Sequence, residues 1–206
     1  MKTIILTIAT VASLIVGTAN TTYATNRKDV QTTLSHVGNI NKIEVRGNVE
    51  VYVTNGTKDA VTVNNNYYAE SALIQDENGV LRISSYKTEK LVVYVTASDL
   101  RTISAYDNAE VKSDGRLAAI DLTINLYNNA YAGLTLDNYA ANINVNDRAK
   151  ADLAGTIVEY NLNYSNASTV NRAKLVATNT TENKIVEPRI AKQLKPELAD
   201  DLVVVL

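Results

Sequence analysis

Polar side chains that could bind a ligand or transfer a proton recur in three short segments between residues 106 and 149. These segments read YDNA, YNNA and NDRA and occupy residues 106–109, 127–130 and 146–149. They supply two carboxylates suited to general acid–base work, together with amides and tyrosines that could hydrogen-bond a sugar. The candidate ligand-binding residues selected on this basis are Tyr106, Asp107, Asn108, Tyr127, Asn128, Asn129, Tyr131, Asp147 and Arg148.

The spacing of these segments favours a repeating β fold. Their alanines, Ala109, Ala130 and Ala149, lie 21 and 19 residues apart, and SNAS at 165–168 gives a fourth copy whose Ala167 follows after 18 residues. Alternating apolar and polar residues, typical of strands, precede each copy. Stacked coils would bury their apolar side chains in one column, with parallel strands and right-handed connections. The sequence therefore predicts an all-β, right-handed parallel β-helix or solenoid over 40–186, with coils of about 18–21 residues.

In such a fold each polar segment forms a corner of a coil. Asn and Asp tolerate left-handed backbone angles and bond to nearby backbone, while a small alanine fits inside a tight bend. Asp107, Asn128, Asp147 and Ser165 are expected to form one row, in which amides bond from coil to coil. This structural interpretation competes with a functional one, in which the row of corners hydrogen-bonds a glycan.

Two further interpretations depend on the same stacking. Asp107 and Asp147 would lie two coils apart, about 9–10 Å at the usual strand spacing, which approaches the carboxylate separation of inverting glycosidases. The alternative function is therefore a carbohydrate-binding or polysaccharide-cleaving β-helix that uses both residues. Tyr106 and Tyr127 would stack one coil apart and could offer a flat platform for sugars, or could simply cover strand surface in a chain with 12 Tyr and no Phe or Trp.

The residue types that are scarce exclude several other chemistries. The chain has no Cys and one His, His36, which excludes thiol catalysis, disulfides and metal centres built on thiolates or several histidines. A formal net charge of −2 without a basic block argues against nucleic acid as a partner. The corners lack the glycine-rich repeat of calcium-binding β-rolls. We therefore expect no metal and no cofactor.

The two ends of the chain differ from the repeats. Residues 1–24 combine Lys2, an apolar run over 4–16 and small residues up to Ala24, which is the pattern of a cleaved secretory signal peptide. We expect export, and no membrane span once this segment is removed. Residues 25–39 are expected to form a polar lead. Residues 187–206 form a C-terminal tail that would either cap the last coil or fray.

Two stretches resemble a known family. IEVRGNVEV at 43–51 is similar to the opening strand pair of the putative auto-transporter adhesin head GIN domain family, and LNYSNAS at 162–168 is similar to its recurring corners. The resemblance covers roughly residues 40–180, although Asn or Arg replaces the usual Gly and Tyr often replaces the first Ser. It implies a right-handed β-helix-like fold in an exported protein of the Gram-negative cell envelope, and it implies no enzyme activity.

Together these observations predict a non-enzymatic, exported β-solenoid that acts as an adhesin-like interaction or scaffold module in the periplasm or at the cell surface. The expected partner is a glycan or an envelope protein. The sequence leaves the ligand and the oligomeric state open.

Overall fold

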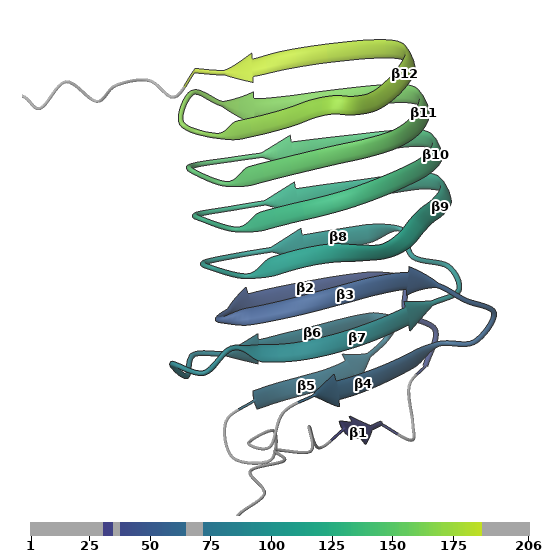
Figure 1. Ribbon diagram of the computed structural model, residues 1–206, viewed down its shortest axis with the longest axis vertical. Helices are drawn as coiled ribbons and strands as arrows, with labels where there is room; N and C mark the ends of the chain where they lie inside the picture. Colours follow the sequence, from purple (N-terminus) through teal and green to yellow (C-terminus); the bar gives the residue numbers. More distant parts are fainter. Residues whose placement is uncertain (1–30, 35–37, 65–71, 187–206) are drawn as a thin grey trace, which may run out of the picture.

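All regular structure in the described part of the chain is β structure. The computed structural model describes residues 31–34, 38–64 and 72–186 (Figure 1). The strands are β1 (Gln31–Thr33), β2 (Lys42–Gly47), β3 (Val49–Asn55), β4 (Ala60–Asn64), β5 (Ala72–Glu77), β6 (Val80–Ser85), β7 (Leu91–Ala97), β8 (Thr102–Ala105), β9 (Glu110–Leu126), β10 (Tyr131–Val145), β11 (Lys150–Ser165) and β12 (Thr169–Ile185). The all-β prediction is confirmed for these ranges, while the predicted signal peptide and C-terminal tail lie outside them.

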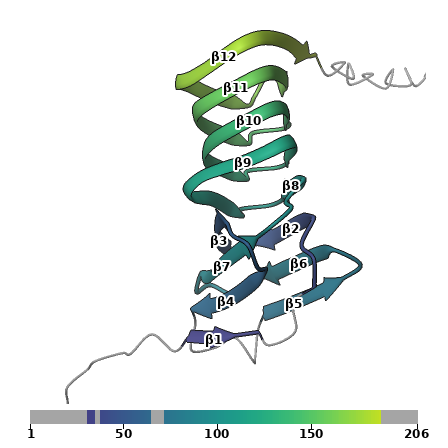
Figure 2. The same ribbon diagram turned by 90° about the vertical axis from the view of Figure 1, so that its right-hand side faces the viewer.

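The four long strands β9 to β12 stack in parallel. Tyr131 of β10 pairs with Glu110 of β9 and Lys150 of β11, and Lys150 in turn pairs with Thr169 of β12. Successive strands are therefore offset by 21, 19 and 19 residues. Each strand curls midway, so that its two halves face each other across the stack, and narrow turns join the strands along one edge (Figures 1 and 2). The parallel stacking and the period agree with the predicted coils in this part of the chain.

The first third of the chain does not follow the prediction of coils stacked in chain order from residue 40. β2 lies between β6 and β8, and β3 lies between β7 and β9, with all four pairs parallel. Residues 42–55 are thus inserted between segments that follow them in the sequence. Such an arrangement depends on long-range pairing, which no local pattern of residues encodes.

Antiparallel pairs complete this lower end and correct the expectation of a purely parallel sheet. β4 pairs with β1 and β7, and β5 pairs with β6. Asn78 and Gly79 have φ angles of 52° and 80°, which suits the two-residue turn of the β5–β6 hairpin. Because β1 lies within residues 25–39, that segment is not only the polar lead expected from the sequence.

The core is a set of aliphatic columns enclosed by the two halves of each coil. One column runs through six strands by direct pairing and contains Leu81, Ile43, Ile103, Ile124, Ile143 and Leu162. All six side chains are buried, and each contributes roughly 1.5–3 kcal/mol by leaving water. The column explains how a chain without Phe or Trp fills its interior.

The column ends in a charged residue. Glu182 of β12 is the register partner of Leu162, and its carboxylate forms an ion pair with Arg172, which lies ten residues earlier in the same strand. Terminal repeats need polar surfaces, and inward-pointing charges protect the free edge of a sheet from pairing with another chain. The last described coil therefore carries its own polar cap, and the predicted capping by residues 187–206 stays a prediction.

We predict that replacing this cap with apolar residues will cause self-association. The double change Arg172→Leu and Glu182→Leu extends the aliphatic column to the open end, where a second copy can cover it. Light scattering after gel filtration should give a larger mass than for the unmodified protein at equal concentration. The matched control is Asn171→Leu with Thr181→Leu, which adds the same side chains on the outer face. Equal masses for the unmodified protein and the Arg172→Leu, Glu182→Leu variant would contradict the assignment of this ion pair as a cap.

Candidate functional site

The predicted corner segments lie one above another at the edge of the stack where the strands are joined (Figure 1). Asp107, Asn128 and Asp147 have φ angles of 61°, 59° and 52°, in the left-handed region that Asn and Asp tolerate. Ala109, Ala130 and Ala149 follow two residues later, are fully buried, and donate their backbone N–H to the carbonyl three residues earlier at 3.0–3.1 Å. The structural interpretation of the corners is confirmed.

Hydrogen bonds join each corner to the next. The Asn128 Oδ1 accepts from the Asp107 backbone N–H at 3.2 Å, and the Asp147 Oδ2 accepts from the Asn128 backbone N–H at 2.7 Å. A parallel row is formed by Asn129, whose Nδ2 donates to Asn108 Oδ1 at 3.3 Å and whose Oδ1 accepts from Arg148 Nε at 3.1 Å. These side chains therefore use much of their hydrogen-bonding capacity in contacts that stabilise the fold.

The sequence prediction places the fourth copy of the corner one residue out of register. Ser168, and not Ala167, takes the alanine position, because its N–H donates to the Ser165 carbonyl and Thr169 pairs with Lys150. The residue equivalent to Asp147 is therefore Asn166, and the expected place of Ser165 in that row is wrong. The error arose from matching alanines, whereas strand pairing keeps the coil at 19 residues.

The structure does not bring Asp107 and Asp147 into one hollow. The Asp107 carboxylate accepts from the Tyr86 hydroxyl at 3.2 Å, while the Asp147 carboxylate closes the neighbouring turn. A hollow of about 90 Å³ lies beside Asp147 and Asn166, and Asp107 does not line it. Paired acid–base catalysis needs both groups on one substrate, so this geometry gives the polysaccharide-cleaving alternative no support.

The predicted stacking of Tyr106 on Tyr127 is confirmed, with ring centroids 4.9 Å apart and planes 6° from parallel. The Arg46 guanidinium lies 3.8 Å from the Tyr106 centroid. Tyr127 and Arg46 thus occupy ring faces of Tyr106, and sugars bind tyrosine through such faces. A flat sugar platform on Tyr106 is therefore unavailable.

Tyr131 directly follows the corner residue Ala130 and is the first residue of β10. Its hydroxyl donates to Asp152 Oδ2 at 2.8 Å, and burial together with this hydrogen bond raises the pKa of Tyr131. Its sequence neighbours in the corner do not share this contact. Tyr131 is thus a residue of the strand surface. The candidate residues chosen from the sequence therefore lie in two places, the corner row and the start of β10.

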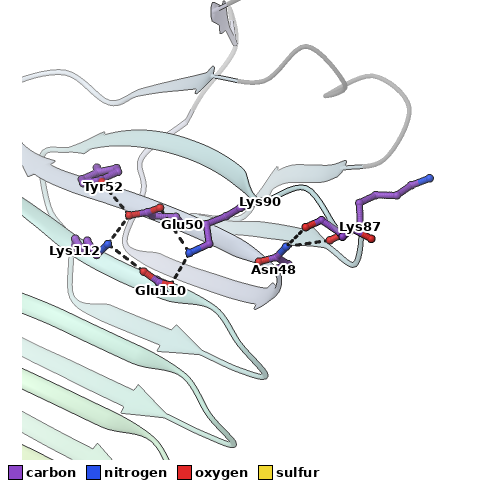
Figure 3. A network of polar contacts seen from close by, with 8 residues as sticks. Asn48, Glu50, Tyr52, Lys87, Lys90, Glu110 and Lys112 are labelled. Atoms are coloured by element: carbon purple, nitrogen blue, oxygen red, sulfur yellow. Dashed lines mark hydrogen bonds and ion pairs between the residues drawn. The ribbon is translucent and has the colours of Figure 1, made fainter. Parts of the chain in front are cut away.

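A charged network missed by the sequence interpretation joins β3, β9 and Lys90, the residue directly before β7 (Figure 3). Lys112 Nζ lies 2.5 Å from Glu50 and 3.0 Å from Glu110, and Lys90 Nζ lies 2.6 Å from Glu110. Tyr52 donates its hydroxyl to Glu50 at 2.8 Å. The network connects the inserted segment to strands that come later in the chain, so its members are far apart in sequence and no local pattern predicts it.

The ion pairs shift the pKa values of the network. The hydrogen bond from Lys90 lowers the pKa of Glu110, and the hydrogen bond to Glu50 raises the pKa of Lys112. Burial by itself raises the pKa of Glu50, but Lys112 and Tyr52 outweigh it, so the pKa is lowered overall. Each shift favours the charged forms in the folded protein.

A second feature missed by the sequence interpretation is a ladder of amides on the outer face formed by β8 and the second halves of β9 to β12. Each Nδ2 donates to the side-chain oxygen of the coil before it, at 2.8–3.4 Å, along Ser104, Asn125, Asn144, Asn163 and Asn183. In the neighbouring column Asn142 bonds to Asp121, and Asn161 bonds to Asn142. The recurrence of Asn at 125, 144, 163 and 183 is the sequence signal that could have found it.

A hollow of about 620 Å³ lies beside this ladder. Its walls are the segment 98–102 and the bend of β9 at 118–121, together with Thr123. Asp99 and Arg101 form an ion pair of 2.6 Å there, and Ile120 is 83% exposed. Carboxylate, guanidinium, hydroxyl and apolar groups are thus available to a ligand in one place.

Two other features are absent from residues 31–34, 38–64 and 72–186. Within these ranges no three His, Cys, Asp or Glu residues are grouped so that they could hold a metal ion. The same ranges contain no helix that is long and apolar enough to cross a membrane.

Comparisons with known proteins agree with the resemblance found in the sequence. The family model described as "Putative auto-transporter adhesin, head GIN domain" matches residues 39–184. A search of curated proteins finds no match.

Three solved structures have a similar fold. A putative adhesin from Bacteroides fragilis NCTC 9343 is 17% identical over 76% of each chain, with a TM-score of 0.65. A putative adhesin from Parabacteroides distasonis ATCC 8503 is 18% identical over 76% of this chain and 78% of its own, with a TM-score of 0.50. A putative lipid binding protein from the same strain is 10% identical over 75% and 78%, with a TM-score of 0.55. At these identities the likeness concerns the fold alone.

We predict that the corner row contributes measurably to stability. Asn128→Ala removes the acceptor used by Asp107 and places a Cβ-bearing residue without a polar side chain at a φ of 59°, whereas Asn128→Gly removes only the acceptor. The alanine variant should lose roughly 1–2 kcal/mol more unfolding free energy than the glycine variant, because left-handed geometry costs that much. Urea unfolding measures the difference. Equal losses would show that the backbone angle is unimportant.

A second prediction concerns acid. Glu50 and Glu110 have pKa values below their ordinary 4.5, so they stabilise the fold above that pH and lose this contribution as the pH falls through their lowered pKa values. Glu50→Gln should lower the unfolding free energy at neutral pH by roughly 1–3 kcal/mol and flatten its fall below pH 4.5. Urea unfolding between pH 3 and about 7 tests both effects.

Glu77→Gln is the control for the acid prediction, because Glu77 is exposed and lies 3.9 Å from Arg82. A loosely paired surface charge contributes about 0–1 kcal/mol. If Glu50→Gln and Glu77→Gln behave alike at all pH values, the network has no special role in stability.

Proposed function

Because the chain belongs to the family "Putative auto-transporter adhesin, head GIN domain", we propose that it is an exported, non-enzymatic interaction module of the bacterial cell envelope. In this proposal the stacked strands form a right-handed β-solenoid, since parallel crossover connections are right-handed almost without exception. The signal-peptide pattern of residues 1–24 supports export to the periplasm or the cell surface.

One observation carries the proposal: the stack is a rigid surface whose outer rows repeat hydrogen-bonding groups at the strand spacing. Amide rows run along Asn108 and Asn129 at the corners, and along Asn125, Asn144 and Asn163 on the outer face. A rigid, repeating surface binds an extended partner without losing conformational entropy of its own. Such a surface suits attachment to a glycan or an envelope protein better than it suits turnover of a substrate.

The proposal leaves catalysis out for a structural reason. The two carboxylates considered for polysaccharide cleavage, Asp107 and Asp147, are engaged in separate corner contacts. The names of the three proteins of similar fold mention adhesion or lipid binding and no enzyme activity. These names support an interaction role and do not identify the partner.

Photocrosslinking in intact cell envelopes tests the proposal without assuming a ligand class. A photoreactive phenylalanine analogue replaces Tyr86, which is 73% exposed beside the corners, or Tyr139, which is 59% exposed at the bend of β10. We expect at least one position to yield a crosslinked envelope component. The matched control is the same analogue in place of Tyr160, which is 1% exposed and should yield none.

The proposal fails if neither exposed position captures an envelope component and the purified protein also binds nothing on a glycan array at micromolar concentration. A component captured from Tyr160 as readily as from Tyr86 would mean that the protein had unfolded. Circular dichroism of each variant checks this point independently.

A further inference from the structure

The two central columns of the outer face that carries the amide ladder contain no charged side chain over five coils, and the carboxylates of Asp121 and Glu159 lie in the column beside them. The two central columns contain Thr102, Thr123, Asn142, Asn161 and Thr181 in one, and Ser104, Asn125, Asn144, Asn163 and Asn183 in the other. The amide grid is the name used below for these ten residues. The register partners of Thr102 and Ser104 on the next strand, β2, are the charged residues Lys42 and Glu44. In these two columns, charged side chains are therefore present at β2 and absent from β8 to β12.

The hydrogen bonds within the amide grid leave capacity for a ligand. Each interior Asn of the ladder uses one amide hydrogen and one oxygen lone pair on its neighbours along the stack. An Asn side chain has two amide hydrogens and two lone pairs. One donor and one acceptor per coil thus stay available, repeated every ~4.8 Å. Because the ladder fixes the amides in one orientation, the free groups form a regular array.

The chemistry of the amide grid selects one class of partner. Protein interfaces centre on aromatic, methionine and arginine side chains, and the grid has none of these. An anionic polymer or membrane surface needs basic residues, which the grid also lacks. Hydroxyl groups that both donate and accept are the natural complement of free amide hydrogens and lone pairs.

The 620 Å³ hollow continues the grid at one end. Thr102 and Thr123 belong to the grid and also line the hollow. There a ligand meets the Asp99–Arg101 pair and the exposed Ile120, a combination of charged hydrogen-bonding groups and an apolar contact typical of ligand pockets. A chain lying on the grid along the stack would place its terminal unit in this hollow.

We propose that the amide grid and the adjoining hollow bind a neutral, extended polysaccharide whose chain runs along the stack. This inference rests on the proposed function and names the ligand class and the face. It places the binding surface on the outer face of β8 and the second halves of β9 to β12, whereas most candidate residues chosen from the sequence lie in the corner row.

Electrophoresis of the full chain through gels containing a dissolved polymer tests the inference. The probes are the neutral polymers hydroxyethylcellulose, dextran and galactomannan, with the anionic polymer alginate for comparison. At least one neutral polymer should slow the protein in proportion to its concentration, and alginate should not. No retardation by any neutral polymer, or equal retardation by alginate, overturns the inference.

Matched variants locate the site. Asn144→Asp with Asn163→Asp should weaken binding by about tenfold, because two hydrogen-bonding positions are altered. Asn108→Asp with Asn129→Asp makes the same chemical change in two bonded amides of adjacent coils at the corners, and binding should be kept. If the corner variant binds the polymer more weakly than the grid variant, the assignment to the grid is overturned and the corners are favoured.

Two further measurements keep the test decisive. If the grid double variant does not fold by circular dichroism, Thr123→Val replaces it, since it removes one hydroxyl shared by grid and hollow with little change in shape. If light scattering shows that the grid variants disrupt a dimer while no polymer slows the protein, the face binds a second copy and the inference is wrong. Failure here leaves the envelope crosslinking test unaffected, so the two proposals can fail separately.

Discussion

The parallel pairing of successive strands at an offset of 19–21 residues is the constraint on which the rest of the structure depends. Once Glu110, Tyr131, Lys150 and Thr169 are register partners, the two-residue period of a strand assigns the positions that follow to columns, up to the register shifts at 133–135 of β10 and 152–154 of β11. Each side chain then contacts mainly the residues that occupy the same position in the neighbouring coils. Isoleucines pack on isoleucines, amides bond to amides, and corner follows corner.

This constraint explains which features could be predicted from the sequence. A corner needs a left-handed residue and a small inward one, so Asp107 and Ala109, and their counterparts in the next coils, carry a local signal. The stacking of Tyr106 on Tyr127 followed from the same reasoning. The alternation of strands and the missing Phe and Trp were sufficient for the all-β class and an aliphatic interior.

The features that escaped prediction depend on pairing between distant segments. The insertion of residues 42–55 between β7 and β9 and between β6 and β8 brings Glu50 to Lys112, a contact across 62 residues. The Arg172–Glu182 cap resembles any exposed pair until Leu162 is seen beneath Glu182. The amide ladder has a sequence signal, the recurrence of Asn at 125, 144, 163 and 183, but Asn is also typical of turns, so its type alone does not separate strand positions from corners.

Charge divides the same columns into parts with different roles. One column contains Arg82 of β6, Glu44 of β2, Ser104 of β8 and then the four asparagines. It is charged only at β6 and β2, where Lys42, Glu44 and Arg82 form ion pairs. Above β2 the side-chain links between coils in this column are amide hydrogen bonds, in which each interior asparagine uses one donor and one acceptor. Stability at that face therefore does not require the remaining donors and acceptors, and they are free to meet a partner. In a repeating stack, the bonds that hold the coils together also set the spacing of the groups that are left for binding.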